Sequence, residues 1–382
     1  MYKYQSVKKL QNHLLMIKFN KILFQPGELV IDNVLHCGQA FRWVFHEDLR
    51  QYSASLNVGG KYRIVVVKQG KDNCIEYGTL DTIEEDVLRS FVESYFRLEV
   101  PLLDLFAKDW ALRDSRLKSK APLGVRILAQ DPWETLVSFI CSSNNNISRI
   151  TKMCHALSSN YGDKLGVYNG VEHCSFPSSA QLLERASESE LRTLGFGYRA
   201  KYIMGTAQKM QELAKGMLSD TPLLENWKKT LNYEQIRENF MGFPGVGPKV
   251  ADCVCLSGMR LDHVVPVDVH IARIAQRDYR FVSRKRDLFQ LQDMYKDMPI
   301  TRRKINYELD SIRIMFKELW GDYAGWIQGI VFAQEIGKTL GATQEGTISK
   351  RKLEIEVKVE EKVGTEVVAM EIKRRITESV QS

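Results

Sequence analysis

An amine and a carboxylate stand close together in one stretch of this sequence. Residues 243–252 read Phe-Pro-Gly-Val-Gly-Pro-Lys-Val-Ala-Asp, and a further aspartate, Asp268, follows sixteen residues later. A neutral lysine amine can attack an electrophilic carbon and form a Schiff base, and a carboxylate can stabilise the positive charge that develops. Lys249 and Asp268 are therefore a candidate nucleophile and its partner. By position alone, Lys249 could equally be a surface lysine and Asp268 an ordinary helix N-cap.

The two glycines before this lysine predict a tight turn between helices. Gly245 and Gly247 flank Val246, and glycine permits positive φ and the close approach of another backbone. The turn ends where a helix begins, and free N–H groups together with the helix dipole make such an N-terminus an anion site. A plain helix–helix turn is the alternative. We expect helices on both sides of the turn and a third after it, over residues 233–241, 248–257 and 268–278.

The stretch from Pro244 to Lys249, taken with Val265-Pro-Val-Asp-Val-His270, resembles the helix-hairpin-helix, Gly/Pro-Asp superfamily of DNA glycosylases. More narrowly, it is similar to the eukaryotic 8-oxoguanine DNA glycosylase/AP lyases of fungal type. Four other motifs support this resemblance in the same order along the chain: Gly38-Gln-Ala-Phe-Arg-Trp43, Cys141-Ser-Ser-Asn-Asn-Asn146, Gly195-Phe-Gly-Tyr-Arg-Ala200 and Gly321-Asp-Tyr-Ala-Gly-Trp-Ile-Gln328. The match spans residues 20–335.

The resemblance implies a bifunctional enzyme of base excision repair that removes 8-oxoguanine paired with cytosine from duplex DNA. The damaged nucleotide would flip out of the duplex, because its C1′ cannot be reached inside the stack. Lys249 would then attack C1′ and expel the base, and the resulting Schiff base would permit strand cleavage by β-elimination. Asp268 would stabilise the cationic sugar. The resemblance also gives His270 a phosphate contact at the flipped nucleotide, and it gives the hairpin glycines a DNA-binding role.

The same resemblance implies a base pocket made from distant segments. Oxidation at C8 places a hydrogen on N7, so a backbone carbonyl at Gly38 would distinguish 8-oxoguanine from guanine. Cys253 and Phe332 match the residues that sandwich the base, and Gln328 matches the amide that bonds its Watson–Crick edge. From their pattern alone, these positions predict a strand bend, two core residues and a solvated helix residue.

A further set of residues matches those that handle the duplex around the extruded base. Tyr198 corresponds to the wedge that enters the stack. Arg149 and Arg199 correspond to two donors that read the orphaned cytosine, and Asn144 to the side chain that fills the gap. Without the resemblance, each would be taken as an ordinary surface polar residue.

These residues need a mixed scaffold, and the sequence predicts one. Residues 29–78 read as antiparallel β structure, with alternating segments on either side of a Gly59-Gly60 turn. Residues 80–340 read as helices that Gly and Pro interrupt, including segments at 133–143, 148–159, 179–187 and 200–215. We expect an α+β protein in which a sheet like that of TATA-binding protein packs on a two-part helical domain. The expected divisions are an extension (1–20), a β domain with flanking helices (21–130), the helical domain (131–340) and a disordered tail (341–382).

Composition narrows the class of protein. The 382 residues carry 54 Lys and Arg against 47 Asp and Glu, a net charge of +7, which is compatible with a polyanionic partner. No apolar run is long enough to span a membrane. The seven cysteines include no C-x-x-C pair, and we expect reduced thiols, no metal and no cofactor. Because no cysteine follows Cys255, the iron–sulfur relatives of the superfamily are excluded. We expect a monomer.

Two alternatives stay open at this point. A non-catalytic helix-hairpin-helix protein would also bind DNA, although it would not require Lys249 and Asp268 together. The cellular location is also open. The first 27 residues contain lysines and no acidic residue, which fits a mitochondrial presequence or a disordered extension. Basic clusters at 350–352 and 373–375 favour the nucleus.

Overall fold

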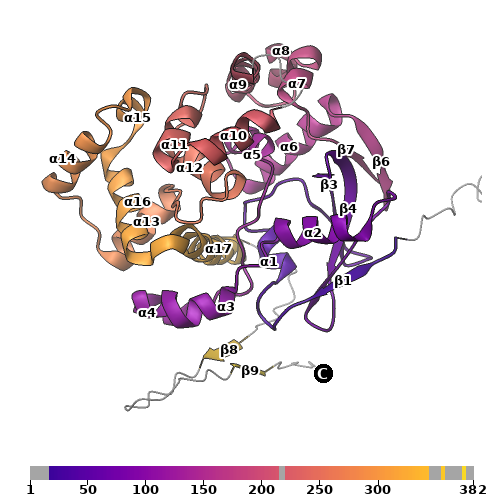
Figure 1. The fold of residues 1–382 in the computed structure, drawn as a ribbon, viewed down its shortest axis with the longest axis horizontal. Coiled ribbons are helices and arrows are strands. Elements are labelled where there is room, and N and C mark those ends of the chain that lie inside the picture. Colours follow the sequence, from indigo (N-terminus) through magenta and orange to yellow (C-terminus); the bar gives the residue numbers. More distant parts are fainter. Residues whose placement is uncertain (1–16, 215–219, 344–353, 358–371, 376–382) are drawn as a thin grey trace, which may run out of the picture.

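The computed structural model describes residues 17–214, 220–343, 354–357 and 372–375. An antiparallel sheet lies on one side of the molecule and a larger body of helices on the other (Figure 1). Each side has its own buried cluster of hydrophobic side chains. The predicted α+β class is confirmed.

The sheet has five strands in the order β1-β5-β4-β3-β2, and every neighbouring pair is antiparallel. Its central hairpin turns at Gly59-Gly60, whose φ angles are +61° and +79°, and Val58 pairs with Lys61. The hairpin predicted at these glycines is therefore confirmed. The strands are β1 (Asn20–Leu23), β2 (Val44–His46), β3 (Gln51–Val58), β4 (Lys61–Gln69) and β5 (Cys74–Thr79).

Two elements differ from the sequence prediction. The short helix α1 (Ile31–Leu35) interrupts a region that was expected to be β throughout, because it buries Ile31, Val34 and Leu35 on one side. A hairpin of two strands, β6 (Lys164–Tyr168) and β7 (Val171–Cys174), lies within the part predicted to be helical. Its turn is Asn169-Gly170, with φ angles of +44° and +77°, and this dipeptide is itself a strong hairpin signal.

The β6–β7 hairpin packs on β3 and β4, so the helical half of the chain contributes to the surroundings of the sheet. The Ser55 hydroxyl on β3 donates to the carbonyl oxygen of Cys174 at 2.5 Å. The buried guanidinium of Arg42 bonds both carboxylate oxygens of Glu134 at 2.7 and 2.6 Å. Since Glu134 belongs to α5 (Pro132–Cys141), these contacts fasten the sheet to the first helix of the helical body.

The helical body contains the helices predicted around the glycine turn at Gly245 and Gly247 and in the first part of the domain, so these predictions are confirmed. Between the sheet and α5 lie α2 (Glu85–Tyr95), α3 (Leu102–Leu105), a π-helical turn (Phe106–Trp110), α4 (Ala111–Arg113) and a 3₁₀ turn (Ser115–Ser119). The next helices are α6 (Ile147–Tyr161), α7 (Ser179–Arg185), α8 (Glu188–Thr193), α9 (Arg199–Ala214), α10 (Thr221–Thr230) and α11 (Tyr233–Met241). The last are α12 (Pro248–Cys253), α13 (Val269–Tyr279), α14 (Lys285–Met294), α15 (Pro299–Lys304), α16 (Tyr307–Trp320), a 3₁₀ turn (Gly321–Tyr323) and α17 (Ala324–Thr343).

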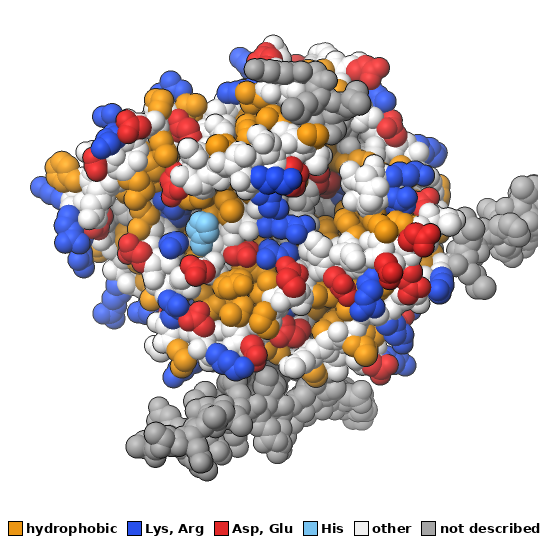
Figure 2. Space-filling model, in the orientation of Figure 1, with side chains coloured by type: hydrophobic (Ala, Val, Ile, Leu, Met, Phe, Trp, Pro, Cys, Tyr) orange, Lys and Arg blue, Asp and Glu red, His pale blue; other side chains and the backbone are white. Residues whose placement is uncertain are grey.

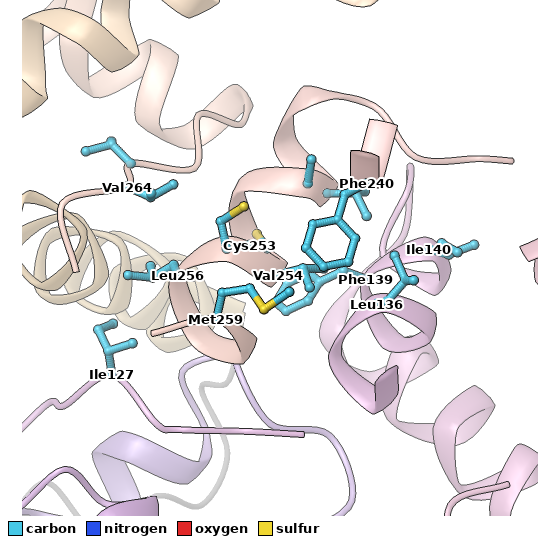
Figure 3. Close-up of a cluster of buried hydrophobic side chains, with 14 of the residues drawn as sticks. Ile127, Leu136, Phe139, Ile140, Phe240, Cys253, Val254, Leu256, Met259 and Val264 are labelled. Carbon is cyan, nitrogen blue, oxygen red and sulfur yellow. The ribbon is translucent and has the colours of Figure 1, made fainter. Parts of the chain in front are cut away.

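The core of this body lies between α5 and the segment after the glycine turn. Helix α12 continues into a π-helical turn, Val254–Gly258, so the helical segment ends near the predicted residue 257. Figure 3 shows side chains of α5, among them Leu136 and Phe139, packed beside Val254 and Met259. Burial of these apolar side chains holds α12 in place against the centre of the molecule.

The two ends of the chain are described in part. Helix α17 runs to Thr343, three residues beyond the predicted end of the domain, and two short strands, β8 (Glu354–Val357) and β9 (Ile372–Arg375), pair within the predicted tail. Residues 1–16 and the basic cluster at 350–352 lie outside the described residues. In the described part of the chain, no helix combines the length and apolar character needed to cross a membrane.

Candidate active site

The glycine turn places an open helix N-terminus at the surface. Gly245 has φ +74°, and a Cβ there would lie 2.6–2.7 Å from atoms of Tyr202, so the fold requires glycine. Gly247 has an extended backbone, and a Cβ there would meet nothing within 4 Å. Val246 between them is buried. Neither glycine amide donates to an acceptor within the described ranges, which leaves both amides available to an anion.

Lys249 lies in the first turn of α12 and lines a pocket. Its Nζ is 3.4 Å from the Ser142 hydroxyl, a long hydrogen bond, and 4.7 Å from the centre of the Phe139 ring. Such weak contacts keep the amine in place without committing its lone pair or protons to a strong partner.

Asp268 caps the next helix and borders the same pocket. Its Oδ1 accepts the backbone N–H groups of His270 at 2.9 Å and Ile271 at 3.0 Å. Its Oδ2 accepts no hydrogen bond from the described residues. Asp268 thus caps α13 through one oxygen and also lines the pocket, so the cap and a position at the pocket do not exclude each other.

The pocket draws its walls from both halves of the chain. All six residues predicted for catalysis and base binding line it: Gly38, Lys249, Cys253, Asp268, Gln328 and Phe332. These residues are separated by up to 294 positions in the sequence, and the fold brings them to one place.

Gly38 lines this pocket from a loop of the sheet domain that hydrogen bonds hold in place. Its φ is +79°, which L side chains rarely adopt, and an added Cβ would lie 2.9 Å from the end of the Ile147 side chain, so glycine suits this position. The neighbouring Gln39 holds the loop, because its amide donates to the carbonyl of Arg126 at 2.8 Å and accepts the N–H of Leu128 at 2.9 Å. Sequence reasoning gave Gln39 no role, although it belongs to the motif that suggested Gly38.

The remaining walls are apolar with one polar group. Burial raises the pKa of the Cys253 thiol to about 11, although the nearby Lys249 opposes the shift, so the thiol stays neutral near pH 7. The ring of Phe332 lies edge-on to His270, with centroids 5.8 Å apart. Gln328 is 8% exposed, and its side-chain amide makes no hydrogen bond to a described residue, so that amide is free to bind a ligand.

The four residues predicted to contact the duplex also come together, at an edge of the molecule that we call the duplex edge: Asn144, Arg149, Tyr198 and Arg199. The Tyr198 hydroxyl donates to the Ser143 carbonyl at 3.1 Å, and Arg199 donates to the carbonyls of Ser143 and Asn144. Arg149 reaches across from α6 to the carbonyl of Gly195 at 3.0 Å. Tyr198 is 46% exposed, whereas Arg199 is only 3% exposed and was wrongly taken, from pattern alone, for a surface residue.

Behind the pocket, α12 is held by buried charges that sequence reasoning missed. Asp252 accepts from Arg237 at 2.8 Å and from the Tyr233 hydroxyl at 2.8 Å. Arg237 also bonds Asp310 at 2.6 Å, and Asp310 bonds Arg313 at 3.2 Å. Burial would raise the pKa of Asp310, but these two guanidinium groups hold it at about 2. Burial instead raises the pKa of Asp252, with Arg237 opposing the shift.

A lysine in the first turn of a helix that follows a Gly-x-Gly turn, with a helix-capping aspartate that lines the same pocket, is typical of a helix-hairpin-helix DNA repair glycosylase. The comparisons with known proteins agree. Residues 21–136 match the family described as 8-oxoguanine DNA glycosylase, N-terminal domain, and residues 137–292 match the HhH-GPD superfamily base excision DNA repair proteins. The chain belongs to the 8-oxoguanine DNA glycosylase family.

Relatives span nearly the whole chain. The chain is 47% identical to the N-glycosylase/DNA lyase of Saccharomyces cerevisiae over 93% of its own length and 96% of the relative's. It is 32% identical to the N-glycosylase/DNA lyase OGG1 of Arabidopsis thaliana, covering 81% of this chain and 78% of that protein.

Among solved structures, the 8-oxoguanine glycosylase/lyase of Clostridium acetobutylicum is similar in fold. Its complex with duplex DNA that contains cytosine opposite 8-oxoguanine is 26% identical, covers 85% of this chain and 98% of its own, and gives a TM-score of 0.66. Its apo-form gives a TM-score of 0.64 at 27% identity, over 83% of this chain and 98% of its own.

Proposed function

We propose that this protein is a bifunctional DNA glycosylase and AP lyase that excises 8-oxoguanine paired with cytosine from duplex DNA. The observation that carries this proposal is that Gly38, Lys249 and Asp268, which come from three separate segments, line one pocket. The relatives named as N-glycosylase/DNA lyases support it.

In this mechanism the Lys249 amine attacks C1′ of a nucleotide that has left the duplex. The attack uses the lone pair of the Lys249 Nζ nitrogen. The bond from C1′ to the base breaks, and its electron pair leaves with the purine. Asp268 stabilises the positive charge on the sugar as that bond breaks. Opening of the sugar ring then gives an imine with Lys249, and loss of a proton from C2′ expels the 3′ phosphate.

Selection of the damaged base falls to the pocket walls. The N7–H of 8-oxoguanine donates to the Gly38 carbonyl, whereas N7 of guanine carries a lone pair that the carbonyl would repel. Gln328 bonds the Watson–Crick edge of the base, and Cys253 and Phe332 cover its two faces. A neutral thiol suits this position, because a thiolate would be desolvated against an aromatic ring.

Helix α11, the glycine turn and α12 form the unit that we call the hairpin. The hairpin and the duplex edge hold the DNA around the flipped nucleotide. The free amides of Gly245 and Gly247 bind a backbone phosphate, and His270 binds another. Tyr198 enters the stack, Asn144 fills the gap, and the two arginines beside them read the orphaned cytosine.

Trapping with borohydride tests this proposal. The protein is incubated with a duplex that carries one 8-oxoguanine opposite cytosine, and reduction of the imine should give a covalent protein–DNA adduct. Lys249→Gln should lower adduct formation by on the order of 10³-fold or more, because no amine remains at the reactive carbon. The exposed lysine of a sheet turn, changed as Lys71→Gln, is the matched control.

Two results would count against the proposal. Adduct formation by the Lys249→Gln protein at the rate of the unchanged protein would show that another group is the nucleophile. Tight binding of lesion DNA by the unchanged protein, without base release or adduct, would instead favour a non-catalytic DNA-binding protein.

A further inference from the structure

We propose that the short helix α15 is a second phosphate-binding element, which extends the grip of the hairpin along the DNA backbone through Arg302 and Arg303. The inference rests on the proposed function, because its partner is the same duplex. Helix α15 lies beyond residue 292, where the match to the superfamily model ends, so this element is additional to the matched domain.

Both ends of α15 are fastened to the helix that leads into the hairpin. At its start, the carboxylate of Glu238 on α11 accepts the N–H groups of Ile300 at 2.9 Å and Thr301 at 2.7 Å. At its end, the Lys304 ammonium donates to the carbonyl oxygens of Met241 and Val246. A helix tied at both ends keeps a fixed distance and orientation relative to the turn between α11 and α12.

The contacts of Lys304 place positive charge directly behind the hairpin. A second ammonium, that of Lys209 on α9, donates to the neighbouring carbonyl of Gly242 at 2.7 Å. Partial burial, together with Arg303 and Lys209, lowers the pKa of Lys304. Three carbonyl oxygens at and beside the turn therefore accept hydrogen bonds from lysines. The two glycine amides of the turn donate to no acceptor within the described residues and stay available to a phosphate.

The two arginines next to Lys304 carry charge that the protein does not neutralise. Arg302 and Arg303 are exposed, and neither makes an ion pair or a side-chain hydrogen bond within the described parts of the chain. Because a helix rises about 1.5 Å per residue, both lie within about 3 Å of Lys304 along the helix axis. They therefore lie in the same helical turn as the lysine that contacts the hairpin.

The surrounding segment is basic as a whole. Residues 280–304 hold eight Lys and Arg against three Asp and Glu, which accounts for much of the net charge of the chain. Figure 2 shows Lys and Arg side chains, with Asp and Glu among them, along the edge of the molecule where Figure 1 places α14 and α15. A DNA backbone that runs from the hairpin toward this edge would meet Arg302 and Arg303, which α15 holds in a fixed position.

Salt dependence of binding tests the inference. Affinity for a duplex with a stable abasic analogue opposite cytosine is measured between 50 and 200 mM salt for the unchanged protein and for the double variant Arg302→Gln, Arg303→Gln. Each lost phosphate contact should reduce the slope of log K against log salt by about 0.9, so the double variant should lose about 2 in slope and roughly tenfold in affinity at low salt. The control is Lys61→Gln with Lys71→Gln, which removes the same charge from exposed turns of the sheet.

A second measurement locates the contact on the DNA. Single phosphates are replaced by neutral methylphosphonates along the strand bound by the hairpin. One or two replacements should weaken binding of the unchanged protein but leave the double variant unaffected, because the contact is already lost. Lys304→Met should also weaken binding, whereas Lys304→Arg, which keeps a cationic donor for the carbonyls, should largely restore it.

The inference is overturned if the double variant keeps the slope of the unchanged protein, or if the control pair loses as much. It is also overturned if every methylphosphonate affects both proteins equally. These outcomes can occur while the unchanged protein still excises 8-oxoguanine, so they are distinct from a failure of the proposed function.

Discussion

The lesion pocket and the duplex edge are built from opposite kinds of contact. The pocket is backed by buried groups that serve the protein alone, since Asp252 anchors α12 to Arg237 and Gln39 pins the loop of Gly38. At the duplex edge, the exposed Tyr198 and the buried Arg199 instead donate to nearby backbone carbonyls. The walls of the pocket are thus fixed before a ligand binds. The hydrogen-bond donors of the duplex edge must instead give up their present acceptors before they can bind DNA.

This difference suggests how reading of the opposite base is coupled to base extrusion. Releasing a charged hydrogen bond such as that of Arg199 costs about 1.5–3 kcal/mol unless a new acceptor replaces it. The N3 and O2 atoms of cytosine become free acceptors only after its partner has left the stack. Under the proposed function, the edge therefore favours binding where a guanine-type base has flipped out opposite cytosine.

The largest effect is expected behind the pocket. Asp310→Asn leaves Arg237 and Arg313 without their shared carboxylate, and breaking a buried ion pair typically costs about 3–5 kcal/mol. Urea unfolding should show this loss. Asp293→Asn, at a position whose side chain is 81% exposed, should change the free energy of unfolding little. Equal stability of the two variants would show that the network does not hold α12.

The same network predicts a dependence on pH. Because the folded protein holds the pKa of Asp310 at about 2, below the ordinary value of 3.8, its contribution is fully present above about pH 4 and is lost as pH falls toward 2. The contribution is about 2 kcal/mol at most. The Asp310→Asn protein should therefore lose less stability over this interval than the unchanged protein.

The carboxylate in the pocket is expected to affect the rate of excision rather than the free energy of unfolding. Asn is a good N-cap, so Asp268→Asn should keep α13 and DNA binding intact while it removes the charge that faces the sugar. Single-turnover excision should slow by about 10²–10³-fold, which corresponds to about 3–4 kcal/mol or less. An unchanged excision rate would leave Asp268 as a cap with no part in the reaction.

The smallest effect is expected at the duplex edge. Arg149→Gln and Arg199→Gln should each reduce the preference for cytosine opposite the lesion by about tenfold, since each removes a charged donor worth about 1.4 kcal/mol. The preference is measured as the ratio of single-turnover rates with cytosine and adenine opposite 8-oxoguanine. Arg192→Gln, which changes an exposed arginine paired with Glu188, is the control. If both edge variants keep the original ratio, the edge does not read the base.

The sequence could predict a residue's role where the constraint on that residue is local, and could not where the constraint comes from distant parts of the chain. The Gly245 turn was predictable because its requirement is local, namely a positive φ and no Cβ. Lys249 and Asp268 were found through a resemblance, since the pattern alone also allowed a surface lysine and a cap. Asp310 could not be predicted, because a charged residue within a helix gives no sign that a distant arginine will bury it.

The missed elements show the same limit. Helix α1 is too short to display a clear helical period, although the β6–β7 hairpin did carry an Asn-Gly signal that the surrounding helices masked. The contacts of Lys304 depend on where α15 docks, and docking is set by long-range packing that periodicity does not encode.

Helix α5 joins the two halves, and the matched family domains meet inside it, between residues 136 and 137. Gly38 reaches the pocket from one side of this junction, and Lys249 from the other. Under the proposed function, the carbonyl that recognises the N7–H of the damaged base and the amine that breaks its bond to the sugar are therefore encoded in different parts of the gene. A lineage could alter the loop that carries this carbonyl in the first part, while the amine and the other base contacts of the second part are inherited unchanged.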